Sequence, residues 1–355
     1  VRGVVINRAS NIGLDFQGAS GGSWVEGSYF GLDYAGAAIS TINNVAVTVQ
    51  SNSITVGGAL PAARNIISGA NNYALLLSGV SGAIVRGNYI GTDAAGTNDN
   101  FNGSYSVYSS GALSPVIGGA GAGEGNLISA ANFGAGLILN GAGELVQGNR
   151  IGSDSTGTSA IPNATGVYAI GTTGALIGGT AAGTGNLISG NQSFGIQVSS
   201  APAMLIQGNR IGTRPDGLTA LPNSLGIYLS SAATVGGVAA GAGNILARNA
   251  SDGVAVAGGV GSVIRGNSIF GNGGLGIDLS DNGRSPNDLN DSDAGPNLTQ
   301  NFPVLIAATI SGGNLFVTYS VNSDPGNAAY PLTVDFYESD LLGQGRVYLG
   351  TNTYT

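Results

Sequence analysis

The residues best suited to hold a metal ion lie in one acidic stretch, residues 278–305, "DLSDNGRSPNDLNDSDAGPNLTQNFPVL". Its oxygen-bearing side chains are spaced along a turn that Gly295 and Pro296 follow, as in calcium-binding loops. The candidate ligands are Asp288, Asn290, Asp291 and Asp293. The stretch is not an EF-hand, because Phe302 stands where that loop needs a bidentate glutamate. The sequence therefore predicts a Ca²⁺ site here, and a solvated acidic linker is the alternative.

A second candidate site consists of tyrosines in a recurring tetrapeptide, glycine–apolar–x–apolar, in which x varies. Two copies carry tyrosine at x, Tyr168 and Tyr228, and a weaker copy, Ser106–Ser109, carries Tyr108. Successive side chains of a strand point to opposite faces, so we expect x to point outward when its neighbours are buried. If these strands stack two layers apart, their rings recur at roughly 10 Å and can hold successive sugar rings. The sequence predicts a strip that binds a glycan or a partner; the alternative is that tyrosine simply favours an exposed strand.

The composition removes many kinds of chemistry. The chain has 355 residues, with 11 arginines but no lysine, histidine or cysteine. The usual proton shuttles and several common nucleophiles are therefore missing. A net charge of −8 disfavours nucleic-acid binding. We expect no membrane-spanning segment, because glycine, asparagine and serine interrupt every apolar run.

The elements that position these residues are repeats. The phrase "LVQGNRIGS" at 145–153 returns as "LIQGNRIGT" at 205–213, and the tetrapeptide recurs about every 30 residues. Within one period, short alternating segments at 195–199, 204–207 and 210–213 are each followed by glycine, asparagine or serine. Three strands and three bends per period predict an all-β parallel β-helix of about ten rungs, with two rung types that alternate.

Asparagines repeat with the strands. One set recurs at the same place in alternate rungs, and a second set does so in the rungs between: Asn88, Asn149, Asn209 and Asn267, then Asn65, Asn126, Asn186 and Asn244. We expect their amides to stack at bends, where they satisfy backbone groups and each other. The loop carboxylates Asp33, Asp93, Asp154 and Asp216 also recur. We expect these to cap their own turns; a lateral calcium ladder is the alternative.

This pattern resembles the right-handed parallel β-helix repeats of bacterial secreted and cell-surface proteins over residues 4–281. That superfold also includes pectate lyases, polygalacturonases, alginate epimerases, tailspikes and adhesins, so the resemblance implies the fold more specifically than an activity. The polygalacturonase motifs are absent, because the chain has no Asp–Asp pair, no histidine and no lysine. Basic groups that a lyase would need are present, but they recur in pairs at repeat positions: Arg150 with Arg210, and Arg86 with Arg265. The sequence leaves the enzyme question open and favours a role without catalysis.

We expect three segments along the chain. Residues 1–283 form the β-helix, residues 284–301 the acidic linker or calcium loop, and residues 302–355 a small β-sandwich-like module. The last segment carries hairpin signals at Ser311–Asn314 and a turn at Asp324–Gly326. It is too short for a seven-stranded sandwich, so we expect it to be incomplete and the chain to be part of a longer protein.

These features predict a non-catalytic, extracellular structural or adhesive β-solenoid of a bacterial surface, such as a stalk, matrix or filament component. Low charge, one methionine and no cysteine suit long exposure outside a cell. Solenoid ends expose unpaired strands, so end-to-end self-association is expected unless the ends are capped. The alternative is a carbohydrate-binding or polysaccharide-cleaving β-helix protein that uses the tyrosine strip.

Overall fold

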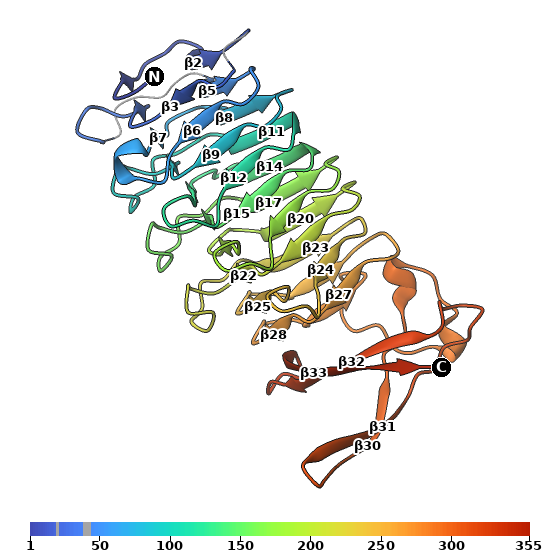
Figure 1. The fold of residues 1–355 in the computed structure, drawn as a ribbon. Helices are drawn as coiled ribbons and strands as arrows, with labels where there is room; N and C mark the ends of the chain where they lie inside the picture. Colours follow the sequence, from blue (N-terminus) through green and yellow to red (C-terminus); the bar gives the residue numbers. More distant parts are fainter. Residues whose placement is uncertain (19–20, 38–43) are drawn as a thin grey trace.

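The computed structural model describes residues 1–18, 21–37 and 44–355. The chain winds into an elongated coil whose N-terminal and C-terminal ends lie far apart (Figure 1). Each turn of the coil contributes one strand to each of three sheets, which contain ten, ten and nine strands in the described residues. We call one such turn a rung and number the sheets 1 to 3 in the order in which the chain enters them.

Sheet 1 contains the shortest strands: β1 (Val5–Ile6), β4 (Tyr29–Phe30), β7 (Ile66–Ile67), β10 (Tyr89–Ile90), β13 (Leu127–Ile128), β16 (Arg150–Ile151), β19 (Leu187–Ile188), β22 (Arg210–Ile211), β25 (Ile245–Ala247) and β28 (Ser268–Phe270). Sheet 2 contains the longest: β2 (Ile12–Phe16), β5 (Val45–Val49), β8 (Tyr73–Ser78), β11 (Tyr105–Leu113), β14 (Ala135–Ala142), β17 (Thr165–Ile170), β20 (Phe194–Ser199), β23 (Leu225–Leu229), β26 (Val254–Val256) and β29 (Ile277–Leu279). Sheet 3 contains β3 (Trp24–Val25), β6 (Thr55–Gly57), β9 (Ile84–Arg86), β12 (Val116–Gly118), β15 (Leu145–Gln147), β18 (Leu176–Gly178), β21 (Leu205–Gln207), β24 (Thr234–Gly236) and β27 (Val263–Arg265).

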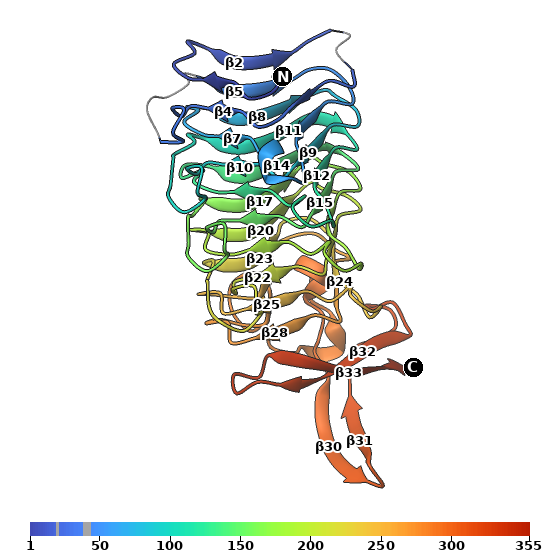
Figure 2. The ribbon, with the colours of Figure 1, turned by 60° about the vertical axis from the view of Figure 1, so that its left-hand side comes forward.

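All neighbouring strands in these sheets pair in parallel, and the rungs stack along the coil axis (Figure 2). The predicted all-β parallel β-helix is therefore confirmed, including three strands per turn. The interior is aliphatic because each rung places the same residue type over the rung before it. Ile151, Ile188 and Ile211, for example, are consecutive register partners in sheet 1 and are completely buried. Stacking at about 4.8 Å per rung makes the coil on the order of 45 Å long.

Both predicted sets of asparagines lie in a single buried ladder at the turn between sheets 3 and 1. The amide Nδ2 of each member donates to Oδ1 of the next at 2.9–3.0 Å. The first asparagine ladder consists of Asn65, Asn88, Asn126, Asn149, Asn186, Asn209, Asn244 and Asn267. The expected stacking of amides is confirmed, and alternate rung types share one ladder.

A second asparagine ladder, which the sequence analysis did not single out, lies at the turn between sheets 1 and 2. It consists of Asn163, Asn191, Asn223, Asn249 and Asn272, linked by side-chain hydrogen bonds of 2.9–3.1 Å. The close approach of the next rung and of this ladder explains the glycine of the tetrapeptide. A Cβ at Gly166 would lie 2.5 Å from the carbonyl oxygen of Gly195 and 2.9 Å from Nδ2 of Asn191.

The recurring loop carboxylates cap turns, as expected. Oδ1 of Asp154 accepts hydrogen bonds from the backbone N–H groups of Thr158 and Ser159. Asp33, Asp93 and Asp216 accept equivalent bonds from backbone groups two to five residues ahead. Hydrogen bonds from the Thr219 hydroxyl and from the backbone of Leu218 and Thr219 lower the pKa of Asp216 to about 2. These oxygens are already engaged, which favours the turn-capping role over a calcium ladder.

Beyond β29 the coil ends and the chain changes character. Two 3-10 helices, η2 (Leu289–Asp291) and η3 (Pro296–Thr299), lie in the acidic stretch. A third 3-10 helix, η1 (Pro61–Ala63), lies between β6 and β7 in the coil. Two separate antiparallel pairs follow: β30 (Val304–Ser311) with β31 (Asn314–Ser320), and β32 (Leu332–Ser339) with β33 (Gly345–Tyr354). The hairpin predicted at Ser311–Asn314 is confirmed. The described residues of this segment form two antiparallel hairpins, and Tyr319 of the first packs against Phe336 and Tyr354 of the second.

The β32–β33 hairpin covers the C-terminal end of the coil, and β33 lies against β28. Oε1 of Gln344 accepts hydrogen bonds from the backbone N and Nδ2 of Asn272, and its Nε2 donates to the carbonyls of Asn272 and Gly274. Gln344 thus adds a last amide to the second asparagine ladder. Arg265 forms a bidentate ion pair with Asp335, with N–O distances of 2.8 and 2.7 Å. The hairpin therefore caps the coil, because its side chains bond to polar groups of the last rung that have no further rung to pair with.

Candidate functional site

The variable position of the tetrapeptide forms one continuous column along sheet 2. Its members are register partners in ten successive strands: Asp15, Thr48, Leu76, Tyr108, Ile138, Tyr168, Gln197, Tyr228, Ala255 and Asp278. We call these residues the outward column. Tyr108, Tyr168 and Tyr228 are half-buried, and they lie two rungs apart with Ile138 and Gln197 between them. The spacing that the strip needs is therefore present.

Further aromatic residues join two of these tyrosines. Tyr108 lies 5.4 Å from Tyr73 and 6.1 Å from Tyr105, measured between ring centroids, and Tyr73 stacks on Tyr105. Tyr228 lies 4.9 Å from Phe194. Tyr73, Tyr105 and Phe194 start their strands, at the third residue before the outward column, and that recurrence is the signal that could have found them. Sheet 2 thus presents two aromatic clusters on the face of the outward column.

The four predicted calcium ligands lie in and beside η2. Oxygens of Asp288, Asp291 and Asp293 lie within 4.8 Å of one another. Asn290 has an exposed side chain and is held through its backbone, whose N–H donates to Oδ1 of Asn322 and whose carbonyl accepts from Asp324 and Asn327. The structure therefore brings three of the predicted ligands together.

Hydrogen bonds already occupy much of this cluster, which bears on how well it fits a cation. Asp291 is 4% exposed, and its two oxygens accept from the backbone of Asn301 and from the side chains of Gln300 and Ser323. Hydrogen bonds from Ser292 lower the pKa of Asp288, whereas burial and the charges of Asp288 and Asp291 raise the pKa of Asp293. The donor set is all oxygen, as Ca²⁺ requires, but Asp291 serves chiefly to hold the loop together.

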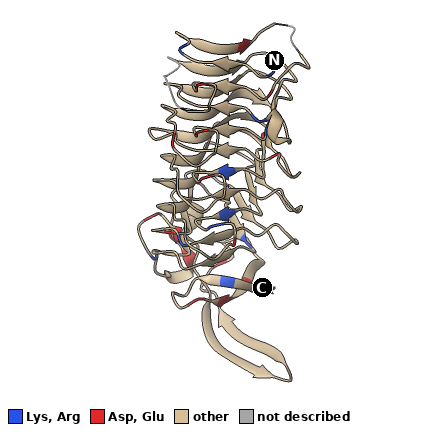
Figure 3. Ribbon diagram, turned by 90° about the vertical axis from the view of Figure 1, so that its left-hand side faces the viewer, with Lys and Arg blue, Asp and Glu red and all other residues tan. Residues whose placement is uncertain are grey.

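Acidic residues gather at the C-terminal end of the coil, as Figure 3 shows. Beside the predicted loop, a second group of carboxylates comprises Asp252, Asp278 and Asp281, whose oxygens lie within 4.8 Å of one another. The sequence analysis did not group them, because Asp252 lies one rung before the other two. The available signal was Asp278, a charged residue at the last position of the outward column.

The arginines considered for catalysis have different surroundings. Arg86 pairs with Glu124 at 3.0 Å, and Arg265 pairs with Asp335, so both of these serve ion pairs. Arg150 and Arg210 are exposed and lie in sheet 1, two rungs apart.

A buried glutamate, Glu144, departs from the repeat. Glu144 is fully buried, and its oxygens accept from the hydroxyls of Ser109 and Thr172.

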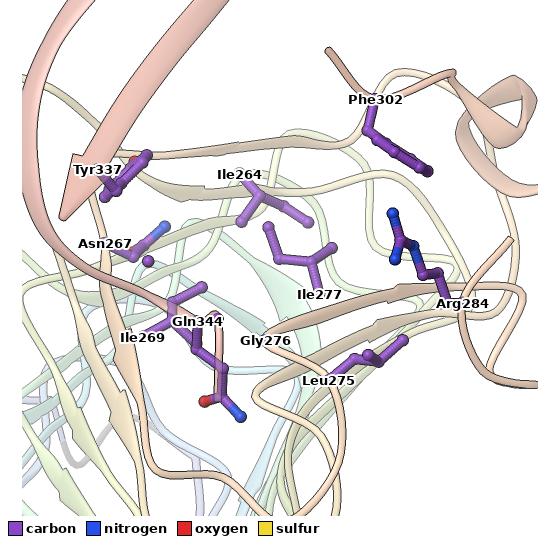
Figure 4. Close-up of a pocket in the computed structure, with 12 residues that line it drawn as sticks. Ile264, Asn267, Ile269, Leu275, Gly276, Ile277, Arg284, Phe302, Tyr337 and Gln344 are labelled. Carbon is purple, nitrogen blue, oxygen red and sulfur yellow. The ribbon is translucent and has the colours of Figure 1, made fainter. Parts of the chain in front are cut away.

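A cavity of about 360 Å³ lies between the last rungs and the capping hairpin (Figure 4). Its apolar lining comes from the exposed end of the core, including Ile264, Ile269 and Ile277, and from Phe302. The guanidinium of Arg284 lies 4.4 Å from the ring centroid of Phe302. The cavity marks where the hairpin spans the end of the coil without filling it.

Comparison with known proteins agrees with this architecture. Residues 124–293 match the family model of the right handed beta helix region, and the same parallel stacking continues in register toward the N-terminus. No curated protein matches the chain. The chain therefore has a parallel β-helix fold followed by two C-terminal antiparallel hairpins, and its similarity to the right-handed family covers residues 124–293.

No helix in the described part of the chain is long and apolar enough to cross a membrane.

Proposed function

We propose that this protein is a non-catalytic structural or adhesive β-solenoid of the bacterial exterior, a stalk, surface, matrix or filament component. The observation that carries the proposal is the pair of buried asparagine ladders, which bond each rung to the next. Amide ladders inside a closed coil resist bending and fraying, because each rung would have to leave buried donors and acceptors unpaired. Such a coil serves as a rigid spacer on the order of 45 Å long.

The chemical composition supports an extracellular setting. Residues vulnerable to oxidation are scarce, with no cysteine and one methionine, and that methionine, Met204, is 1% exposed. Only 8% of the residues are charged, so stability depends little on ionic strength. A coil stabilised by apolar stacking and amide ladders therefore suits an extracellular environment, where the cell does not regulate oxidation or ionic strength.

Small-angle X-ray scattering and multi-angle light scattering test this proposal. A rigid monomeric rod, or a linear assembly of rods, is expected. End-to-end association predicts a mass that grows with concentration while the cross-sectional radius stays constant. A scattering profile that is not rod-like, whether from a compact or from a flexible particle, would contradict the proposal.

Glycan binding along the outward column is a second candidate function, favoured by the alignment of Tyr108, Tyr168 and Tyr228. The test compares the triple alanine variant with Tyr34→Ala, since Tyr34 is 88% exposed and lies outside the column. Binding to polygalacturonate, alginate and cellulose is measured by affinity electrophoresis, and release of reducing or unsaturated ends reports cleavage. Retarded migration that disappears only in the triple variant would support this function. Binding that survives the triple substitution would exclude the strip.

A further inference from the structure

Three carboxylates meet where the coil gives way to the acidic stretch. Asp252 lies just before β26, Asp278 lies in β29 one rung later, and Asp281 follows in the next turn. Each contributes an oxygen to a group whose members lie within 4.8 Å of one another. Asp281 has a positive φ of 53°, so the chain turns sharply at this group.

Two of these carboxylates are withdrawn from water. Asp252 is 7% exposed and Asp278 is 3% exposed. In the described residues, the ion pairs engage other acids, namely Glu26, Glu124 and Asp335. The group therefore concentrates negative charge at low solvent exposure, which is costly without a compensating cation.

The hydrogen bonds of the group leave one buried oxygen without a partner. Asp252 accepts from the backbone N–H of Leu275 and from the Ser251 hydroxyl, and Oδ2 of Asp278 accepts from the backbone N–H of Gly283 at 2.8 Å. Oδ1 of Asp278 is buried and has no hydrogen-bond partner. Buried carboxylate oxygens are rarely left unpaired, so this atom points to a ligand.

We propose that Asp252, Asp278 and Asp281 bind a hard divalent cation of the Ca²⁺ class. Carboxylate oxygens are its preferred ligands, and its tolerance of irregular geometry suits side chains from two rungs and a turn. Backbone carbonyls and water supply the remaining positions. The site is separate from the predicted loop at Asp288–Asp293, in which Asp291 accepts three hydrogen bonds and Oδ1 of Asp288 is the buried oxygen without a hydrogen-bond partner.

The bound cation has a mechanical consequence. It ties Asp281, at the start of the segment that leads to the capping hairpin, to two successive rungs of sheet 2. Metal binding thereby couples the closure of the coil to the folding of the acidic stretch.

The test is isothermal titration of the full chain with CaCl2, together with thermal unfolding in CaCl2 and in EGTA. We expect saturable binding of Ca²⁺ and a rise in Tm of about 3 °C or more at a hundredfold excess over Kd. Asp281→Asn should weaken binding at least tenfold. Asp99→Asn, which removes an exposed acid outside both carboxylate groups, is the matched control and should bind Ca²⁺ as the wild type does.

Asp278→Asn distinguishes loss of the site from loss of the fold. In EGTA this variant should be at least as stable as the wild type, because it removes a buried charge, while in CaCl2 it should lack the Tm gain. Absence of binding heat together with an unchanged Tm in the wild type would overturn the proposal. So would a Tm gain that Asp293→Asn abolishes and Asp281→Asn retains, or an equal response to MgCl2, which would remove the assignment to Ca²⁺.

Discussion

Replacing Asn186 with alanine breaks the first asparagine ladder near its middle, where the consequences can be followed atom by atom. Asn186 is 1% exposed, and its side chain takes part in four hydrogen bonds. Nδ2 donates to the carbonyl of Val146 and to Oδ1 of Asn209, and Oδ1 accepts from the backbone N and Nδ2 of Asn149. Alanine removes all of them at once.

Some of the abandoned groups keep another partner, and this limits the cost. Nδ2 of Asn149 still donates to the carbonyl of Ile117, and Oδ1 of Asn209 still accepts from the backbone N–H of residue 186. The backbone N–H of Asn149 loses its partner, and the carbonyl of Val146 loses a donor. A buried polar group left unpaired costs about 1–3 kcal/mol, so we expect the free energy of unfolding to fall by about 2–4 kcal/mol.

Urea denaturation followed by circular dichroism measures this loss. The control is Asn71→Ala, because Asn71 lies in an exposed bend. We expect the control to shift the free energy of unfolding by less than about 0.5 kcal/mol. If both variants unfold at the same urea concentration, the ladder does not hold the rungs together, and the proposed origin of the rod's stiffness is refuted.

Three further predictions concern the cap and the repeat. Gln344→Ala should destabilise the last rung by about 1–3 kcal/mol and speed amide hydrogen exchange at Asn272, because it removes that residue's buried partners; unchanged exchange would contradict the capping role. Burial raises the pKa of Asp335, but hydrogen bonds from Arg265 and Thr351 outweigh it and leave that pKa below its usual value. The resulting stability is present above about pH 4 and is lost as pH falls through the lowered pKa, so Arg265→Met should flatten the decline of Tm in acid, and an equally steep decline would count against it. Gly195→Ala should lower Tm, because its Cβ would lie 2.7 Å from the carbonyl oxygen of residue 226; an unaltered Tm would show that strand β20 can shift to make room.

The acidic stretch shows where pattern-based prediction of a site meets its limit. Alternate spacing of oxygens was expected to direct the predicted ligands into one calcium site. The chain instead takes left-handed conformations at Asn290 and Asp291, with φ of 65° and 61°, and Asn322, Asp324 and Asn327 bind the backbone of residue 290. These partners lie more than thirty residues away, so no local pattern reports them. Calcium binding by this loop stays a prediction.

The sequence by itself determined the all-β coil, the rung period, the tyrosine column and the amide stacking. Each is a periodic feature, and stacking brings periodic residues into register. Tyr108, Tyr168 and Tyr228 share a column because each occupies the same place in its strand and the strands pair in register. Only the tertiary structure decided the aperiodic contacts. The cap of Gln344 on Asn272 and the grouping of Asp252 with Asp278 and Asp281 depend on how the chain leaves the coil. At the end of the coil the repeat stops, so the neighbours of a residue there depend on long-range packing and not on the period.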